Sequence, residues 1–283
     1  MVDPQFAMEW LTPDYGYAIA YSQVLQRTQT PYQLLEVLDT PRFGHVLRLD
    51  GALQCSEHDE YFYHEPLVHL PALLHSAPRT ALIVGGGDGG AAEELLKHRS
   101  IEWVQLVDID EAVVDASRRW LTSVNKGLFD KPSFRFGWRV EDGLKFVRNH
   151  TAVYDLILLD LTDSGGPSTS LYSAAFFNSC ALRLNIGGLL ALHLASPWAQ
   201  PEKVRHLLSQ LRAVFPHVQP FQASVPVSGG PWLMAVCGQQ AFQIPTPAIA
   251  RKRLDALTGD KLRIVSPGNL AGLLALPAYV EQF

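Results

Sequence analysis

The stretch "ALIVGGGDGG" (residues 81–90) decides the fold. Four apolar residues of strand character run directly into five glycines and one aspartate, Asp88. Glycine loses more conformational freedom on ordering than any other residue, so this run suits neither a packed helix nor an ordinary strand. The helical pattern "GGAAEELLKHRS" follows at once. The glycines therefore indicate a turn from a strand into a helix, at which some other group approaches the backbone closely.

Strands and helices alternate on both sides of this turn. The pattern predicts strands at "TALIV", "WVQLVDID", "FRFGWRV", "YDLILLDLTD", "GGLLALHLA" and "WLMAVCG", with helical segments between them. A helical pattern at "DEYFYHEPLVHLPALLH" precedes them, with Pro66 expected near its first turn. This alternation is typical of an α/β fold, a doubly wound and mostly parallel sheet covered by helices on both faces.

The first 56 residues differ in style from the rest. They carry short, partly alternating runs separated by the turn signals "TP", "DTPRFG" and "LDG". The sequence therefore predicts two domains, a small N-terminal antiparallel β domain over residues 1–56 and a Rossmann-like domain over residues 57–283.

Composition excludes several classes of protein. The chain has 283 residues, 47% apolar and 18% charged, and a net charge of −5 without a Lys/Arg cluster, so it carries no nucleic-acid footprint. Its three cysteines are far apart and lack zinc spacing, which favours reduced thiols in the cytoplasm. No secretory signal precedes the first strand, and the most apolar stretch is interrupted by Arg183, Asn185 and His193, so no membrane span is expected.

The glycine turn matches the dinucleotide fingerprint as Gly85-x-Gly87-x-x-Gly90. A tight turn that binds nothing is the alternative. Asp88 argues against a pyrophosphate, because a carboxylate in the loop would repel phosphate oxygens. A sulfonium nucleoside of the S-adenosyl type has no phosphate and carries a positive charge. It suits Asp88 better than NAD does.

The next two strands also end in acids. Asp108 stands where an acid would accept hydrogen bonds from the ribose hydroxyls, and helix capping is the alternative there. For Asp110 we expect a helix cap. Asp142 and Gly143 either flank an adenine or begin a helix with Asp142 as its cap, and the sequence leaves both interpretations open.

The fourth strand ends in two acids, Asp160 and Asp163, three residues apart. Buried unpaired carboxylates are costly, and a cationic substrate would offset that cost. An amine nucleophile also arrives as an ammonium and must lose a proton before it attacks. The alternative is a loop with two solvated acids, one of which caps the following helix.

The motifs together resemble a known family. "LRLDGALQCSEHDEYFYHEPLVHLP", "LIVGGGDGG", "VDIDE", "EDG" and "DLTDSGGPSTSLY" occur in the order found in the polyamine aminopropyltransferases, of which spermidine synthase is the best-known member. The resemblance extends from about Trp10 to "ALPAYV". It implies a methyltransferase-type Rossmann-like catalytic domain, a cytoplasmic homodimer or homotetramer, and aminopropyl transfer from decarboxylated S-adenosylmethionine to an amine. Putrescine giving spermidine is the leading reaction, with methylthioadenosine released and neither metal nor separate cofactor required.

The resemblance also implies roles for residues. It assigns contacts with the donor to Gln33, Gly85, Gly87, Asp88, Asp108, Asp142, Gly143 and Pro167. It assigns contacts with the amine to Tyr63, His64, Asp88, Asp160 and Asp163. Among these, Asp160 is the expected general base, and Asp88 is the expected partner of the donor's ammonium group.

Three departures from the family lie near the expected amine site. Ser164 replaces a proline, Ser228 stands near the place of a tyrosine, and His193 stands where glutamine is usual. We therefore expect weaker or broader use of amines, with Trp232 as either a core residue or a wall of the pocket. Cys55 is expected to be a small apolar wall residue. His64 and His69 lack the spacing of metal ligands.

Other functions remain as alternatives. The same chemistry on cadaverine, agmatine or spermidine is the nearest of them. An amine N-methyltransferase that uses intact S-adenosylmethionine is the second. A nucleoside-binding protein without catalysis is the third, and Asp160, Asp163, Tyr63 and His64 argue against it. A dehydrogenase would have to accommodate Asp88 beside a pyrophosphate.

Overall fold

The computed structural model describes residues 5–75, 77–163 and 166–283, and the described chain forms three sheets. The N-terminal part holds two of them. Strands β1 (Gln5–Thr12) and β2 (Tyr15–Tyr21) form a hairpin. Strands β3 (Gln23–Gln29), β4 (Leu34–Thr40), β5 (Gly44–Leu49) and β6 (Ala52–Ser56) form an antiparallel sheet. The N-terminal part is antiparallel β structure, as the sequence predicted, and it is divided into two sheets. Only Ser22 separates β2 from β3, which is too short a link for a turn, so β3 pairs with β4 instead.

The third sheet has seven strands in the order β12-β13-β11-β10-β7-β8-β9. Its parallel strands are β7 (Thr80–Gly85), β8 (Trp103–Asp108), β9 (Phe136–Val140), β10 (Tyr154–Asp160) and β11 (Leu184–Ala195). Strand β13 (Gly230–Gly238) runs antiparallel to both β11 and β12 (His217–Val225). This sheet confirms the α/β, Rossmann-like fold class.

All six strands that the sequence predicted in this sheet are present, but β12 was not predicted. Its sequence, "HVQPFQASV", contains Pro220 and two glutamines, which hide a strand pattern. The strand lies at the edge of the sheet, where a proline that cannot donate to the ladder is tolerated.

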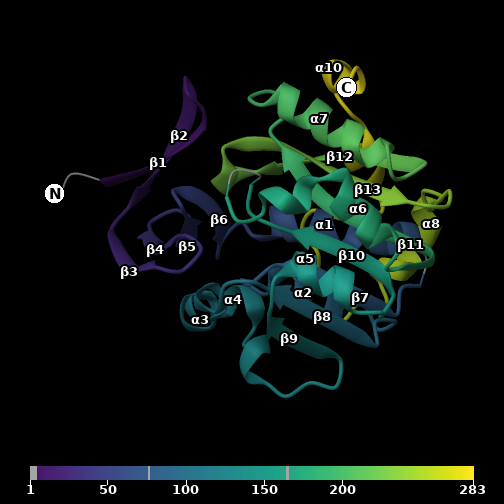
Figure 1. The fold of residues 1–283 in the computed structure, drawn as a ribbon, viewed down its shortest axis with the longest axis horizontal. Helices are drawn as coiled ribbons and strands as arrows, with labels where there is room; N and C mark the ends of the chain where they lie inside the picture. The colour runs from purple at the N-terminus through teal and green to yellow at the C-terminus, as the bar shows by residue number, and fades with distance from the viewer. Residues whose placement is uncertain (1–4, 76, 164–165) are drawn as a thin grey trace.

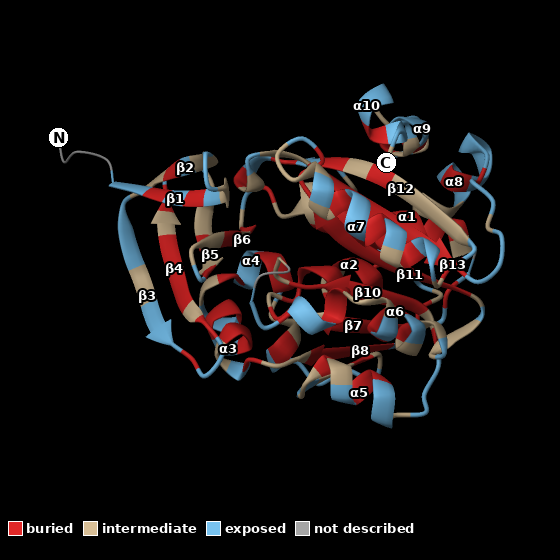
Figure 2. Ribbon diagram, turned by 45° about the horizontal axis from the view of Figure 1, so that its top comes forward, coloured by how far each residue is buried: buried red, intermediate tan, exposed pale blue. Residues whose placement is uncertain are grey.

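Helices cover both faces of the sheet, as Figures 1 and 2 show. On one face lie α1 (Tyr61–His75) and α2 (Gly90–Leu96), which pack against each other. On the other lie α5 (Gly143–Asn149), α6 (Ala174–Ala181) and α7 (Pro201–Arg212). The remaining helices are α3 (Glu111–Trp120), α4 (Thr122–Asn125), α8 (Pro247–Leu254), α9 (Leu270–Leu274) and α10 (Ala278–Glu281). Among the described residues, no helix combines the length and the apolar character needed to cross a bilayer.

Helix α1 is buried along most of its length and connects distant parts of the chain. Pro66 lies inside the helix, beyond the first turn that starts at Tyr61, and not in the first turn itself. The buried carboxylate of Glu65 accepts hydrogen bonds of 2.8 to 3.0 Å from the backbone N–H groups of residues 263–265. The C-terminal segment is thereby fixed to the helix that carries Tyr63 and His64.

A second cluster of apolar residues attaches the four-stranded sheet to α3 and α4. It includes Leu35 and Val37 of β4, Leu47 of β5, and Val113 and Ala116 of α3. This packing holds the four-stranded sheet beside the carboxyl ends of β7 and β8, where the glycine turn lies.

Candidate active site

The glycine turn packs against carboxylates from the neighbouring strands. Gly85 and Gly86 have φ values of 82° and 70°, which side chains rarely adopt. A Cβ atom on Gly85 would lie 2.1 Å from the backbone oxygen of Asp160, and one on Gly86 would lie 2.9 Å from Asp160 Oδ2. A Cβ atom on Gly87 would lie 2.7 Å from Asp108 Oδ2. The glycines therefore make room for the acids of the site itself.

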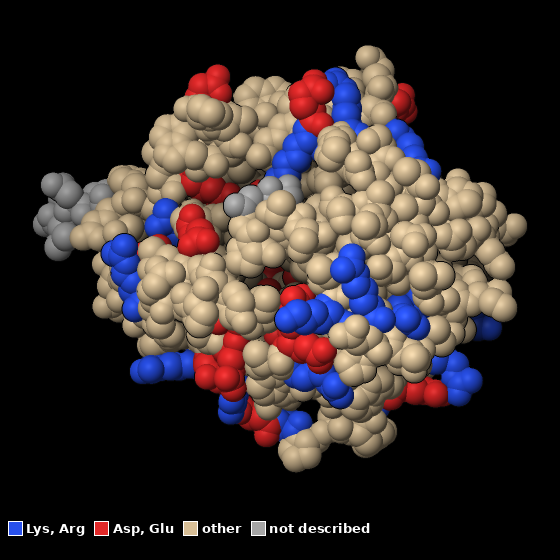
Figure 3. Space-filling model, viewed as in Figure 1, with Lys and Arg blue, Asp and Glu red and all other residues tan. Residues whose placement is uncertain are grey.

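A pocket opens above this turn. Its empty space measures about 1280 Å³, including the part open to solvent. Figure 3, which has the orientation of Figure 1, shows a hollow near the centre of the surface in view, with acidic side chains at its base. Sequence-predicted residues in its walls are Gln33, Tyr63, Gly85, Gly87, Asp88, Asp108, Asp142, Gly143, Asp160, Asp163 and Pro167. His64 is not in the wall. It lies behind Asp88 and is almost fully buried.

Asp108, at the end of β8, supports the glycine turn rather than capping a helix. Its Oδ2 accepts a hydrogen bond of 2.9 Å from the Gly87 N–H, and its Oδ1 accepts one of 2.9 Å from the Asp110 N–H. Burial raises the pKa of Asp108 to about 6. Asp110 is the N-cap of α3, as the sequence predicted, and its Oδ1 accepts from Ala112 N–H. The capping alternative therefore holds for Asp110 and not for Asp108.

Of the two interpretations that the sequence left open for Asp142, the structure confirms the helix cap, and the contact with an adenine stays a prediction. Its Oδ1 accepts from the Leu144 and Lys145 N–H groups and caps α5, and the residue also lines the pocket. Gln33 lies on the opposite wall, and its side-chain amide donates to Asp110 Oδ2 over 3.1 Å. The N-terminal sheet is thereby hydrogen-bonded to the first turn of α3.

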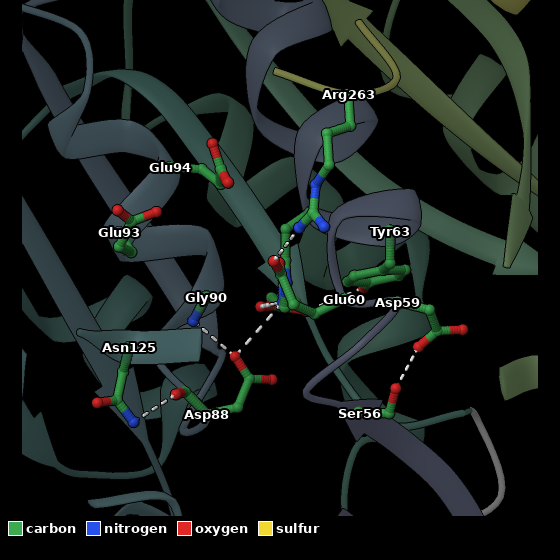
Figure 4. Close-up of polar contacts among 12 residues, drawn as sticks. Ser56, Asp59, Glu60, Tyr63, Asp88, Gly90, Glu93, Glu94, Asn125 and Arg263 are labelled. Atoms are coloured by element: carbon green, nitrogen blue, oxygen red, sulfur yellow. Dashed lines mark hydrogen bonds and ion pairs between the residues drawn. The ribbon is translucent and has the colours of Figure 1, made fainter. Parts of the chain in front are cut away.

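Asp88 and His64 form a largely buried carboxylate–imidazole pair. Figure 4 shows Asp88 facing Gly90, the first residue of α2. Asp88 Oδ1 accepts from the Gly90 N–H at 2.7 Å and lies 3.4 Å from His64 Nε2. His64 Nδ1 lies 2.9 Å from Glu60 Oε2. Burial alone would raise the pKa of Asp88, but the charge of His64 lowers it below its usual value. Burial opposes protonation of His64, but Asp88 and Glu60 raise its pKa well above the ordinary range.

Asp160, at the end of β10, has one engaged and one free carboxylate oxygen. Its Oδ1 accepts from the Tyr63 hydroxyl at 2.9 Å. Its Oδ2 is buried, has no hydrogen-bond partner among the described residues, and lies 4.0 Å from His64 Nε2. Burial, followed by the charge of Asp88, raises the pKa of Asp160 to about 6. Such a carboxylate can accept a proton near neutral pH.

His193, one of the three departures, lies between two tyrosines on the side of Tyr63 away from Asp160 and within one side chain of that carboxylate. Its Nδ1 lies 2.8 Å from the Tyr63 hydroxyl, and its Nε2 lies 2.9 Å from the Tyr172 hydroxyl. Trp232 packs edge-on against His193 with 5.7 Å between ring centroids, and its indole N–H donates to the Ser228 carbonyl oxygen. Trp232 is therefore a wall of the pocket. Ser164, the third departure, lies outside the described residues.

Two residues near the pocket were not identified from the sequence. Glu9 of β1 lines it, and its Oε2 accepts from the Tyr17 hydroxyl at 2.6 Å and from the Leu53 N–H at 2.7 Å. Burial raises the pKa of Glu9 to about 7. A signal was present, since period-two alternation places Glu9 on the buried face of β1 together with Ala7. Lys203 of α7 lies 3.6 Å from Asp163 Oδ2, and no sequence signal pointed to it.

Cys55 is buried, but it belongs to the second apolar cluster and does not line the pocket, so its expected place in the wall is wrong. Its sulfur and one ligand atom each of His64 and Asp88 lie within 4.8 Å of one another, which is a candidate metal arrangement. Metal binding requires a thiolate. Burial, followed by the charges of nearby acids, raises the pKa of the Cys55 thiol well above its usual range and disfavours that form.

The order of the strands, the glycine turn and the acids at the strand ends are typical of Rossmann-like enzymes that bind a nucleoside beyond the carboxyl ends of the strands. The family profile described as "Spermine/spermidine synthase domain" matches residues 60–247, and "Spermidine synthase tetramerisation domain" matches residues 7–57. The chain belongs to the spermidine synthase family, and it is an enzyme of the polyamine aminopropyltransferase type.

Individual relatives agree with this assignment. The polyamine aminopropyltransferase of Nitrosomonas europaea is 41% identical over 280 residues, which cover 98% of this chain and 85% of that protein. The polyamine aminopropyltransferase of Moorella thermoacetica is 36% identical over a region that covers 97% of this chain and 94% of that protein. A spermidine synthase solved with the transition-state analogue AdoDATO has a TM-score of 0.90 at 27% identity, covering 100% of this chain and 96% of that one. The spermidine synthase of Thermotoga maritima gives a TM-score of 0.88, also at 27% identity and with the same coverage. These relatives do not favour the N-methyltransferase alternative.

Proposed function

We propose that this enzyme transfers the aminopropyl group of decarboxylated S-adenosylmethionine to putrescine, giving spermidine and methylthioadenosine. The observation that carries the proposal is the free oxygen of Asp160, buried and without a hydrogen-bond partner among the described residues, at the base of the pocket. A carboxylate in that position is suited to take a proton from an incoming amine.

The donor is proposed to lie over the glycine turn. Asp108 and Gln33 face the ribose side of the pocket, and Asp142 and Gly143 face the base, with Pro167 at the rim. Asp88 is proposed to hold the ammonium end of the aminopropyl group. Burial would raise the pKa of Asp88, but its contact with His64 lowers the pKa below its usual value, which favours the ionised carboxylate when the site is empty.

The reaction is a direct displacement. The amine enters as an ammonium and gives one proton to Asp160. Its nitrogen lone pair then attacks the carbon bonded to the sulfonium, a C–N bond forms, the C–S bond breaks, and its electron pair leaves with methylthioadenosine. Alignment of two bound reactants contributes up to about 7–11 kcal/mol in favourable cases. Tyr63 donates to Asp160 Oδ1 and so directs the free oxygen toward the amine.

The proposal extends to cofactors, assembly and location. The displacement requires no metal and no cofactor besides the donor. The profile of a tetramerisation domain over residues 7–57 supports a homo-oligomer, either a dimer or a tetramer. Three buried free cysteines are consistent with the reducing cytoplasm. Residues 1–56 and 57–283 are proposed as its two domains.

The test is incubation with decarboxylated or intact S-adenosylmethionine and a panel of putrescine, cadaverine, agmatine and spermidine. Mass detection of both products distinguishes the alternatives. We expect methylthioadenosine and spermidine from decarboxylated donor with putrescine. S-adenosylhomocysteine from intact donor would show a methyltransferase. If methylthioadenosine were released only with another amine, that amine and not putrescine would be the acceptor.

A further inference from the structure

Asp163 differs from the other acids of the pocket in the groups that contact its carboxylate. Its Oδ1 lies 3.6 Å from His193 Nε2, and its Oδ2 lies 3.6 Å from Lys203 Nζ. Both carboxylate oxygens therefore face nitrogen atoms of the same chain. Burial would raise the pKa of Asp163, but the contacts with His193 and Lys203 lower it below its usual value. The group is ionised, and its charge is already compensated.

The negative charge available to a substrate is therefore unevenly distributed. At the base of the pocket, Asp160 Oδ2 has no hydrogen-bond partner among the described residues. At the Asp163 end, the ammonium group of Lys203 lies 3.6 Å from the carboxylate and offsets its negative charge. A substrate ammonium that approaches Asp163 meets this ammonium group as well as the carboxylate.

The location of Lys203 makes its pairing with Asp163 informative. Lys203 lies in the first turn of α7, where the helix dipole disfavours a cation. Its side chain is about one-fifth exposed, 22%, and it reaches Asp163 from outside the pocket wall. Asp163 thus compensates the positive charge of Lys203, which is unfavourable in the first turn of α7. Each member of this ion pair stabilises the other.

We propose that Lys203 is a specificity-determining residue that acts as a built-in counter-ion of Asp163 and lowers the affinity of the pocket for the amine. The inference rests on the proposed function and on the contact with the amine that the family resemblance assigns to Asp163. It gives a physical reason for the weaker amine binding that the sequence leads us to expect. The amine gains little at Asp163, because binding there requires that the carboxylate be shared with Lys203 or released from it.

The experiment compares three variants in the full-length protein. Lys203→Met removes the charge and keeps the length of the side chain. Lys203→Arg keeps the charge. Arg205→Met is the matched control, because Arg205 lies on the same helix, pairs with Glu202 and contacts the ring of Phe283. Putrescine affinity is measured by calorimetry with methylthioadenosine bound, and KM and kcat are measured for putrescine.

We expect Lys203→Met to lower the Kd and KM of putrescine about threefold to tenfold, as removal of one nearby charge predicts, with kcat within twofold. Lys203→Arg and Arg205→Met should resemble the wild type. An unchanged or higher putrescine Kd in Lys203→Met, with normal wild-type turnover, would overturn this inference alone. Failure of the wild type to release methylthioadenosine with every amine would overturn the proposed function and this inference with it.

Discussion

Asp160 and Asp163 are three residues apart in the sequence, but their carboxylates lie in different surroundings. Asp160 ends a buried strand, and one of its oxygens lacks a partner among the described residues. Asp163 stands beyond the strand, where His193 and Lys203 reach both of its oxygens. The same side chain is therefore suited to accept a proton at one position and to remain ionised at the other.

The first prediction concerns Asp160→Asn. The amide keeps the shape of the carboxylate but cannot accept the proton, so turnover should fall by about 10²–10⁴-fold. Methylthioadenosine affinity should stay within a few-fold of the wild type. Steady-state kinetics with putrescine and calorimetry with methylthioadenosine give the two values. Near-normal turnover would show that another group is the base.

The second prediction concerns pH. The pKa of Asp160 is raised to about 6, so the carboxylate form required of a base is lost as the pH falls through that value. The kcat/KM of the wild type for putrescine, which reports the enzyme before the amine binds, should therefore decrease below about pH 6, approaching a tenfold loss per pH unit as expected for a single proton. The residual activity of Asp160→Asn should lack this acidic limb. A wild-type kcat/KM that stays constant down to pH 5 would contradict the assignment.

The third prediction concerns Asp108→Asn. The amide presents one oxygen in place of two, so it cannot accept from Gly87, Asp110 and a ribose at the same time. Methylthioadenosine binding should weaken by about 1.5–3 kcal/mol for each lost bond to a charged acceptor. Putrescine binding should change little. Calorimetry with each ligand separates the two effects, and unchanged methylthioadenosine affinity would remove Asp108 from the donor site.

At the scale of single residues, the sequence predicted which side chains lie together in the pocket but not which of them form pairs. Strand ends on one edge of a parallel sheet bring Asp88, Asp108 and Asp160 together, so their positions followed from the pattern. The ion pair between Lys203 and Asp163 joins α7 to a loop, and its geometry depends on how the helix packs. No local pattern encodes that contact.

Among the elements, the glycine turn and α1 depend most closely on each other. The first residue of α2, Gly90, lies against the ring of His64, and a Cβ atom there would be 2.3 Å from Cε1. His64 cannot move aside easily, because Glu60 and Asp88 contact its two ring nitrogens. Helices α1 and α2, from different parts of the sequence, can therefore pack this closely only because residue 90 has no side chain.

The fourth prediction follows from this contact. Gly90→Ala should lower the free energy of unfolding by about 1–3 kcal/mol, as overpacking of a buried site does, and it should reduce activity by displacing His64. Gly268→Ala is the control, because a Cβ atom there meets nothing within 4 Å. Its effect should stay within about 0.5 kcal/mol. Urea unfolding of both variants provides the comparison, and equal stabilities would contradict the prediction.

Elements with a strong pattern were predictable, and elements defined by their neighbours were not. The apolar runs of β7 and β10 lie in the middle of the sheet and are buried on both faces, which makes them visible in the sequence. Strand β12 is an edge strand with Pro220, and its character comes from pairing with β13. The separation of the N-terminal strands into two sheets depends on Ser22, a single residue between β2 and β3.

In the whole molecule, the β1–β2 hairpin lies at one end (Figure 1). Large apolar side chains of β1 are exposed there. Phe6, Met8 and Trp10 are 60%, 43% and 63% exposed on the same side of β1. A two-stranded hairpin is only marginally stable by itself in water. An exposed apolar face on such a hairpin is typical of a surface that packs against another subunit.

The fifth prediction tests that surface. The double variant Phe6→Ser/Trp10→Ser should shift the protein from an oligomer to a 31.3 kDa monomer in sedimentation-velocity experiments. Phe134→Ser is the control, because Phe134 is 91% exposed but lies outside the hairpin. Its sedimentation should equal that of the wild type. A wild type that already sediments as a monomer would contradict the proposed assembly.

The hydrogen bonds from residues 263–265 to Glu65 have a consequence for synthesis of the protein. A ribosome releases the chain from its N-terminus, so α1 emerges almost 200 residues before the N–H groups that Glu65 requires. Until then this carboxylate has no backbone donors from that segment and favours contact with water over burial. The helix that bears Tyr63 and His64 therefore reaches its final packing late. A nascent chain stalled before residue 263 should remain open to proteases around α1.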